Sequence, residues 1–481
     1  MALRLIYCAV FDGLEAKEVE VEVSFTRSLP AFQITGLAGS TIQEARQRVQ
    51  SSLLSNGFKF PPLKIVVNLS PSDLPKQGSF YDLPIALLIA LYDYSDLQEI
   101  ENKKESITWF AFGELGLDGK VKDTPFIYPL LFSLLSKSEN TEAFFILSKS
   151  AENFYSKIPN LKAYYVDTLQ EGIEILRNPP PLEANNADLP FLFEEILGER
   201  YYFSTDFPLD FSDIVGQERA KRAALIAACG FHNILFEGSA GSGKSMIATR
   251  IPYILPPLKR EEILQMAANT LKISPFRPFR NPHNSATKAA ILGSAVNQSI
   301  KQGEIALAHL GVLFFDEIPH FPKNILESMR EPLQNHYFTI SRLHAKVICP
   351  TDFMFVAAMN PCPCGNLLST FKECRCNTKE INVYKNKISD PLWDRLDLFV
   401  QMQEGDANTH RVDTLSLQKD VLNAFIFQKQ RGQRSFNARL YGQEFEEFCI
   451  MEDEAKNILQ KAVTHFGISL RQKHKILRVS R

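Results

Sequence analysis

Short apolar runs alternate with amphipathic stretches in the first third of the chain. Runs rich in β-branched and aromatic residues, such as Glu18 to Phe25 and Lys64 to Asn68, predict strands. The stretches Thr41 to Asn56 and Asp82 to Tyr92 have the spacing of apolar positions that is typical of helices. This alternation predicts one α/β domain over residues 1–177.

The pattern changes between residues 178 and 208, where the chain becomes rich in proline and acidic residues. This composition predicts an extended linker, with a short helix around Phe191 to Leu197. Beyond it, residues 209–404 contain further apolar strand patterns and are expected to form a second α/β domain. Residues 405–481 are polar and helical in pattern, which predicts a small helical lid.

The composition is that of an ordinary globular protein, with 45% hydrophobic and 22% charged residues among 481. No apolar run approaches the roughly 18 residues of a membrane span, and the first residues lack a clear signal-peptide pattern. We therefore expect a cytoplasmic protein without a membrane partner. The formal net charge of −2 neither requires nor excludes a polyanionic partner, because a local patch can bind nucleic acid.

The segment from residue 238 to residue 245 fills every fixed position of the G-x-x-x-x-G-K-[ST] phosphate-binding loop. An apolar strand pattern precedes it and a helical pattern follows it, which is the context that this motif requires. The Lys would reach the β- and γ-phosphates of ATP, and the Ser hydroxyl would hold Mg²⁺. The nucleotide-binding residues are therefore expected to be Gly238, Ser239, Ala240, Gly241, Ser242, Gly243, Lys244 and Ser245.

Polar residues follow two later apolar runs at the points where those strands should end. Asp316 and Glu317 follow Gly311 to Phe315, and we expect Asp316 to act on Mg²⁺ and Glu317 to polarise the attacking water. Asn360 follows Phe353 to Ala358, so its side chain should face the ligand crevice of an open α/β sheet. Taken alone, an Asn-Pro turn is the alternative for Asn360.

Four of the eight cysteines lie close together in the sequence, and the other four are scattered. Two close pairs of thiolates suit tetrahedral Zn²⁺ better than a disulfide in the cytoplasm. The C-x-C spacing is less specific than C-x₂-C, so unliganded or redox-active thiols remain the alternative. The candidate zinc ligands are Cys362, Cys364, Cys374 and Cys376.

The order of these motifs resembles that of an AAA+ ATPase: Asp213 to Glu218, the phosphate loop, the acidic pair, Asn360, and Trp393 to Asp397 before a helical tail. More narrowly, the chain resembles the YifB/ComM family of magnesium-chelatase-like AAA+ ATPases over essentially its whole length. The strings that carry this resemblance are Val67 to Pro75, Phe279 to His283, Gly303 to Val312 and Ala357 to Gly365.

The resemblance implies a Lon-protease-like (ribosomal S5 domain 2-like) first domain and an ATPase that assembles into a homo-oligomeric, hexameric ring. It implies a DNA branch-migration helicase of natural transformation, acting on single-stranded or branched DNA. By the same resemblance, Asn360 matches the first sensor, Arg395 the arginine finger and Arg471 the second sensor. A salt bridge to a neighbouring aspartate is the alternative for Arg395. Since the family's chain continues past Arg481, the lid is expected to be truncated.

The Lon-protease motifs lack both catalytic groups, because Phe80 stands at the nucleophile position and Tyr128 where the lysine should be. A shifted dyad of Ser79 and Lys122 is the alternative. We therefore expect a scaffold or DNA-contacting domain without protease activity.

The sequence favours an ATP-driven motor on DNA over two alternatives, a chelatase motor subunit acting on a tetrapyrrole and an ATP-binding scaffold without turnover. Aromatic and basic residues that could contact DNA occur in Phe276 to Arg280, at Lys288 and in a predicted hairpin from Tyr337 to Val347. The basic residues of that hairpin are Arg342, His344 and Lys346. Each of these side chains could instead belong to a solvated face.

Overall fold

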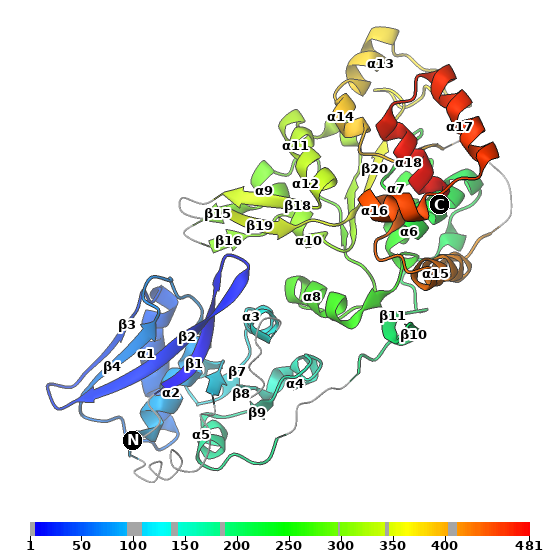
Figure 1. Ribbon diagram of the computed structural model, residues 1–481. Helices are drawn as coiled ribbons and strands as arrows, with labels where there is room; N and C mark the ends of the chain where they lie inside the picture. Colours follow the sequence, from blue (N-terminus) through cyan, green and yellow to red (C-terminus); the bar gives the residue numbers. More distant parts are fainter. Residues whose placement is uncertain are drawn as a thin grey trace. The chain divides into compact units, whose positions relative to one another are not determined.

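The computed structural model describes residues 5–93, 108–135, 143–182, 188–296, 299–341, 346–402 and 411–481. These residues form two compact units (Figure 1). Unit 1 comprises Met1–Pro190 with the short segments Ala267–Ile273 and Asn297–Ser299, and unit 2 comprises the rest of the chain. Helix α8 (Arg260–Thr270) has residues in both.

Unit 1 is built on a seven-stranded mixed sheet in the order β3-β4-β2-β1-β5-β8-β9. The strands β1, β2 and β4 pair in antiparallel fashion, and the remaining pairs are parallel. The strands are β1 (Leu5–Asp12), β2 (Glu15–Thr26), β3 (Ala31–Thr35), β4 (Lys64–Ser70), β5 (Thr108–Ala111), β8 (Ala143–Ser148) and β9 (Ala163–Val166). A small hairpin joins β6 (Glu114–Leu115) to β7 (Val121–Lys122).

The central helix of unit 1 is α2 (Asp82–Ala90), in which every residue is buried. A helix that is apolar all round can be stable only where other elements cover it on every side. It contacts α1 (Ser40–Ser55), α5 (Leu169–Arg177) and several strands. The other helices of this unit are α3 (Ile127–Leu135) and the short α4 (Glu152–Tyr155). The helices predicted near residues 41 and 82 are therefore confirmed.

Unit 2 is built on a five-stranded sheet, and every strand pair in it is parallel. Both faces are covered, so its central strands are continuous apolar runs rather than alternating ones. Alternate residues enter two separate cores: Phe236, Phe314 and Val356 lie on one face, and Phe315 and Phe355 on the other. In sheet order the strands are β14 (Phe279–Arg280), β17 (Val312–Phe315), β20 (Met354–Met359), β12 (Ile234–Glu237) and β21 (Leu398–Gln401).

Short helices and two hairpins complete the first part of unit 2 (Figure 1). The hairpins pair β15 (Ser294–Val296) with β16 (Ser299–Lys301), and β18 (Tyr337–Ser341) with β19 (Lys346–Pro350). The predicted hairpin after Tyr337 is thus confirmed. The helices are α6 (Glu218–Gly230), α7 (Lys244–Arg250), α9 (Lys288–Leu292), α10 (Glu304–Leu307), α11 (Lys323–Ser328), α12 (Arg330–Asn335), α13 (Thr378–Lys385) and α14 (Asp390–Trp393).

The prediction of a helix around Phe191 to Leu197 is wrong, because this segment forms a strand. β10 (Leu192–Ile196) forms a hairpin with β11 (Glu199–Phe203), which also pairs with β13 (Leu258–Lys259). Leu197 and Gly198 both have positive φ, 53° and 81°, as the two-residue type I′ hairpin turn requires. Unit 2 begins at Phe191, so the second half of the expected linker folds with it.

Four helices follow the five-stranded sheet and end unit 2: α15 (Thr414–Gln430), α16 (Gly442–Phe448), α17 (Asp453–Phe466) and α18 (Leu470–Ser480). We call them the C-terminal helices. The expected boundary at residues 404 and 405 lies outside the described residues. Among the residues that are described, no helix is both long and apolar enough to cross a membrane.

Candidate nucleotide site

The predicted phosphate loop connects β12 to α7 at the carboxyl edge of the five-stranded sheet. Its backbone passes through the left-handed region at Gly241 (φ 82°) and Gly243 (φ 93°), which residues with a Cβ adopt at a cost. These two glycines let the chain turn tightly between strand and helix. The sequence therefore folds locally into the strand–loop–helix arrangement that the motif requires.

Lys244 is buried, and its amine points into this loop. Its Nζ donates to the carbonyl oxygens of Gly238 (2.6 Å) and Ser239 (2.8 Å). Burial lowers the pKa of Lys244, while Asp316 and Glu317 act in the opposite direction. An ammonium group held in a partly desolvated loop of carbonyls attracts an anion more strongly than one in bulk water.

Asp316 and Ser245 meet although 71 positions separate them in the chain. Ser245 Oγ donates to Asp316 Oδ2 at 2.8 Å. A hydroxyl and a carboxylate oxygen so close together are the hard oxygen ligands that Mg²⁺ prefers. The structure therefore brings together the two residues predicted to hold this ion.

Glu317 has φ of 51°, in the left-handed region that a residue with a long side chain seldom adopts. Its N–H donates to Asp316 Oδ1 at 3.0 Å. Backbone strain of this kind costs about 1–3 kcal/mol and persists where the surrounding structure fixes it, commonly in active sites. The strained turn places Glu317 directly after a predicted magnesium ligand, near enough to Lys244 for its charge to act on that amine.

Asn360 follows β20, which lies between β12 and β17 in the sheet. Its Oδ1 accepts a hydrogen bond from Lys244 Nζ at 3.2 Å. The ends of three parallel strands thus deliver Lys244, Asp316 and Asn360 to one edge, as expected for a crevice in an open α/β sheet.

Arg395 lies at the opposite, amino edge of the same sheet. Its carbonyl accepts from Asn233 Nδ2 at 2.8 Å, just before β12 begins, and its guanidinium donates to Gln334. The Nε of Arg395 is buried and has no hydrogen-bond partner among the described residues. Since Asn233 and Gly238 lie at opposite ends of β12, about 16 Å of strand separates Arg395 from the phosphate loop of its own chain.

Arg471, on α18, lies beside Arg395 rather than beside the phosphate loop. Its Nη1 is 3.5 Å from Asp394 Oδ2, and Lys475 on the same helix donates to the carbonyl of Leu396 at 2.7 Å. Burial, followed by the charge of Arg471, lowers the pKa of Arg395. The two predicted arginines therefore form one cationic group at the amino edge.

The four predicted zinc ligands come together. The Sγ atom of Cys362 lies 3.4 Å from that of Cys364 and 3.7 Å from that of Cys374, and all four sulfurs lie within 4.8 Å of one another. All four thiols are free. The cluster follows Asn360 directly and precedes α13.

One of the basic residues proposed for DNA contact is structural, which corrects that expectation. Arg277 is buried and donates to the carbonyls of Pro256 and Leu310, so its guanidinium is engaged inside the fold. Arg280 forms a two-pronged ion pair with Glu304 at 2.6 and 2.8 Å, and its side chain is partly exposed. A DNA contact by Arg280 stays a prediction.

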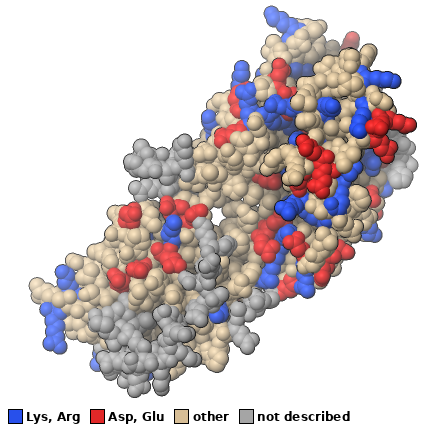
Figure 2. All heavy atoms as spheres, viewed as in Figure 1, with Lys and Arg blue, Asp and Glu red and all other residues tan. Residues whose placement is uncertain are grey.

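Lys288 is exposed and lies beside the β18–β19 hairpin. It lines an open pocket of about 440 Å³ together with Phe338 and Thr339 of β18. Arg342 and His344 lie outside the described residues. On the face of unit 2 that Figure 2 shows, basic and acidic residues are interspersed, so a DNA contact there would depend on local groups.

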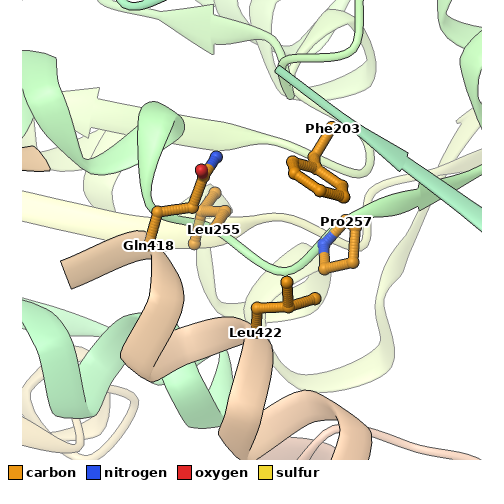
Figure 3. A pocket seen from close by; sticks show the side chains of 5 residues that line it. All are labelled: Phe203, Leu255, Pro257, Gln418 and Leu422. Atoms are coloured by element: carbon orange, nitrogen blue, oxygen red, sulfur yellow. The ribbon is translucent and has the colours of Figure 1, made fainter. Parts of the chain in front are cut away.

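A second cavity of unit 2 is too small to be a ligand site. Its volume is about 10 Å³, close to the minimum for a single water molecule. Figure 3 shows the side chains that close it, which come from β11, from α15 and from the chain before β13: Phe203, Leu255, Pro257, Gln418 and Leu422.

In unit 1, the residues at the Lon-type catalytic positions are part of the core. Phe80 and Tyr128 are 3% and 1% exposed. The hydroxyl of Ser79 donates to Glu114, which pairs across the β6–β7 hairpin with Lys122. The hydrogen bond of Ser79 therefore goes to a carboxylate rather than to the Lys122 amine.

Sequence reasoning missed one pair next to the phosphate loop. Glu237, the last residue of β12, accepts from Lys385 Nζ of α13 at 2.8 Å, across 148 positions of sequence. The one signal that could have pointed to the pair is an acidic residue directly before the first glycine of the motif.

Three family models match most of the chain. The family model "Magnesium chelatase, subunit ChlI" matches residues 210–410, "Subunit ChlI of Mg-chelatase" matches residues 21–150, and "Magnesium chelatase, subunit ChlI C-terminal" matches residues 412–481. The chain is 35% identical to competence protein ComM of Haemophilus influenzae and 34% identical to the uncharacterized protein YifB of Escherichia coli. Each alignment covers 100% of this chain and 93% of the relative. The magnesium-chelatase 38 kDa subunit of Cereibacter sphaeroides is 24% identical over 32% of this chain and 53% of that subunit.

Proposed function

This chain belongs to the YifB/ComM family of magnesium-chelatase-like AAA+ proteins, and from that premise we propose that it is a ring-forming ATPase that remodels DNA. In this proposal it drives branch migration of single-stranded or branched DNA during recombination of incoming DNA in the cytoplasm. A competence role, which the name of the Haemophilus influenzae relative states for that protein, is carried over as part of the proposal. Unit 1 is a Lon-like, non-proteolytic domain, and the C-terminal helices are the lid.

The observation that carries the ATPase proposal is the contact of Ser245 with Asp316 at 2.8 Å beside the buried Lys244. ATP would place its β- and γ-phosphates against the loop amides and Lys244, and Ser245 and Asp316 would hold its Mg²⁺. The metal would supply positive charge that neutralises the phosphates. Glu317 would orient and polarise the attacking water, and Asn360 would help to orient it.

The position of Arg395 and Arg471 supports assembly of several copies. Both arginines lie at the amino edge of the sheet, whereas the phosphate loop lies at the carboxyl edge. An arginine stabilises phosphoryl transfer only where it reaches the transferred phosphate, and another subunit can supply it. In a head-to-tail ring, the amino edge of one subunit faces the nucleotide of the next.

DNA binding rests on the family and on Lys288 beside the β18–β19 hairpin. A lysine that neutralises a phosphate releases a counterion, whereas an aromatic ring such as Phe338 offers a surface for base stacking. The proposal also includes a structural Zn²⁺ bound by Cys362, Cys364, Cys374 and Cys376.

A chelatase-type motor subunit is the second candidate, favoured by the similarity to the Cereibacter sphaeroides magnesium-chelatase subunit. Both candidates use the same ATP chemistry and differ in what stimulates it. A DNA motor is stimulated by DNA, whereas a chelatase motor is stimulated by the partner that binds the tetrapyrrole.

The test measures ATP hydrolysis by the purified protein with and without single-stranded and branched DNA, with Glu317→Gln as the control. Strong stimulation by DNA that is lost in Glu317→Gln is the expected result. An ATP hydrolysis rate that does not change when DNA is added would contradict the DNA part of the proposal. No ATP hydrolysis under any condition would leave a nucleotide-binding scaffold as the function.

A further inference from the structure

We propose that the four-cysteine cluster is a zinc centre that positions Asn360 at the phosphate site, so that the bound metal sets the rate of ATP hydrolysis. This inference rests on the proposed ATPase function. It assigns to the metal a role in turnover and not only in stability.

The spacing of the sulfurs fits the metal. A tetrahedron with Zn–S bonds of about 2.3 Å has sulfurs about 3.8 Å apart. The separations Cys362–Cys374 and Cys364–Cys374 are both 3.7 Å, and Cys362–Cys364 is 3.4 Å. A disulfide would require about 2.05 Å. The side chains therefore lie at the corners of a metal site and not at bonding distance from one another.

The segment that carries the cysteines has no regular secondary structure of its own. Between the end of β20 at Met359 and the start of α13 at Thr378 the chain forms only turns and bends, and most of its side chains are exposed or half-buried. Such a segment buries little apolar surface to offset the entropy of ordering it. Four metal bonds that close the loop supply the missing cross-links.

This loop lies against the phosphate site. Gly365, whose N–H donates to the carbonyl of Cys362 at 3.0 Å, has φ of 79°. A Cβ at Gly365 would lie 3.9 Å from the backbone nitrogen of Ala240 in the phosphate loop and 4.0 Å from Cγ of Asn360. The turn from Cys362 to Gly365 thus lies close to the loop that binds phosphate and to the sensor side chain.

Both ends of the cysteine-bearing segment also connect to residues of the phosphate site. Cys362 lies two residues after Asn360, and Cys376 lies directly before Asn377, which caps α13 in a capping box with Glu380. The last residue of α13, Lys385, forms the 2.8 Å ion pair with Glu237, directly before the first glycine of the phosphate loop. The cluster therefore holds Asn360 in place at the start of the loop. At the end of the loop it holds α13, whose Lys385 pairs with Glu237.

The residues that hold the nucleotide come from other elements. Lys244 and Ser245 begin α7, and Asp316 follows β17. Loss of the metal should therefore leave ATP binding largely intact and displace Asn360, which acts on the attacking water. A slower chemical step with nearly unchanged nucleotide affinity is the result that separates a positioning role from general unfolding.

The experiment compares three variants of the full chain with the wild type. Cys374→Ser removes one ligand, Cys376→His replaces a thiolate by another zinc ligand, and Cys449→Ser changes a cysteine outside the cluster. Metal content is measured on protein purified without added zinc, nucleotide affinity with a fluorescent ATP analogue, and kcat and KM at saturating DNA.

We expect about one zinc per chain in the wild type, in Cys449→Ser and in Cys376→His. In Cys374→Ser the zinc content should fall below about a tenth per chain, kcat should fall on the order of tenfold, and nucleotide affinity should change less than about threefold. If Cys374→Ser does not fold, a zinc chelator applied to the wild type, followed by added zinc, gives the same comparison reversibly.

Metal-free wild-type protein that hydrolyses ATP at full rate overturns the inference. It is also overturned if Cys374→Ser loses zinc and keeps its kcat, and in both cases the proposed ATPase stands. A wild type that binds zinc but never hydrolyses ATP would contradict the ATPase proposal instead. The proposed role of the metal in hydrolysis would then be wrong as well, whereas the zinc site itself would stand.

Discussion

The two edges of the five-stranded sheet of unit 2 differ in how their charges are arranged. At the carboxyl edge, Lys244 contacts Asn360 at 3.2 Å and Ser245 contacts Asp316 at 2.8 Å, an arrangement complementary to a metal-bound phosphate. At the amino edge, Arg395 and Arg471 lie side by side, with Asp394 as an anionic neighbour of Arg471. The carboxyl edge therefore has groups that are suited to bind ATP, whereas the arginines of the amino edge lie away from the phosphate loop of their own chain.

In the proposed ring, one chain carries two halves of two different sites. The length of β12 separates its arginines from its own phosphate loop by about 16 Å, and we propose that the two halves meet between subunits. In that arrangement ATP hydrolysis depends on assembly, because the cation that stabilises the transition state comes from a neighbour. The first three of the following changes each affect one edge, and the last lies outside both.

The largest effect is expected from Arg395→Ala at the amino edge. Loss of an arginine finger lowers kcat by about 10³-fold or more, whereas ATP affinity should hardly change because the phosphate loop is intact. Steady-state hydrolysis and nucleotide titration measure the two quantities. Arg27→Ala, at an exposed arginine of unit 1, is the control, and equal losses in both variants would argue against a special role for Arg395.

Glu317→Gln at the carboxyl edge should lower kcat by about 10²-fold or more, since the amide cannot polarise the attacking water. The substitution keeps the size of the side chain and the strained backbone at φ 51°. ATP should therefore still bind and accumulate on the protein, which a filter-binding assay measures. Weak ATP binding by this variant would mean that Glu317 holds the nucleotide instead of acting on the water.

His309, at the amino edge before β17, should make unit 2 less stable in acid. Its Nδ1 accepts from the backbone N–H of Asp352 at 3.1 Å, and burial lowers its pKa, with Arg277 acting in the same direction and Asp352 against it. The folded protein thus keeps the imidazole neutral where the unfolded chain protonates it. The stabilisation is complete above pH of about 6.5 and falls with decreasing pH, by at most about 1.4 kcal/mol per pH unit.

Urea denaturation between pH 7.5 and 5 checks this prediction by comparing the wild type with His309→Gln. The glutamine variant should show a shallower loss of stability over this range. Parallel curves would mean that the pH dependence arises from other groups.

The smallest effect is expected from Lys288→Ala, which lies at neither edge. DNA affinity should fall several-fold, and the slope of log affinity against log salt should decrease by about 1, as for the loss of one phosphate contact. Fluorescence anisotropy across salt concentrations measures both. Lys272→Ala is an exposed-lysine control, and an unchanged slope in Lys288→Ala would remove this residue from the DNA site.

The sequence predicted the carboxyl edge well because its residues belong to short motifs with fixed local geometry. The loop from Gly238 to Ser245 and the acidic pair after Phe315 need only their neighbours in the chain to be recognised. The turn at Leu197 and Gly198 was missed because the first of these residues rarely adopts positive φ, so a strand was taken for a helix.

Partners that are far apart in the sequence could not be predicted. Arg277 looked like a surface cation, yet it bonds to carbonyls 21 and 33 positions away, which no periodicity shows. The pairing of Glu237 with Lys385 and the position of Arg471 beside Arg395 likewise follow from how the sheet and α18 pack.

The most direct test of a site shared between subunits is to mix two inactive variants. In an Arg395→Ala subunit the carboxyl edge is intact, and in a Glu317→Gln subunit the amino edge is intact. Random assembly of equal amounts should create complete sites at about a quarter of the interfaces and restore up to about that fraction of the wild-type ATPase rate. A mixture that stays as inactive as its two components, although mixed assemblies form, would contradict this account.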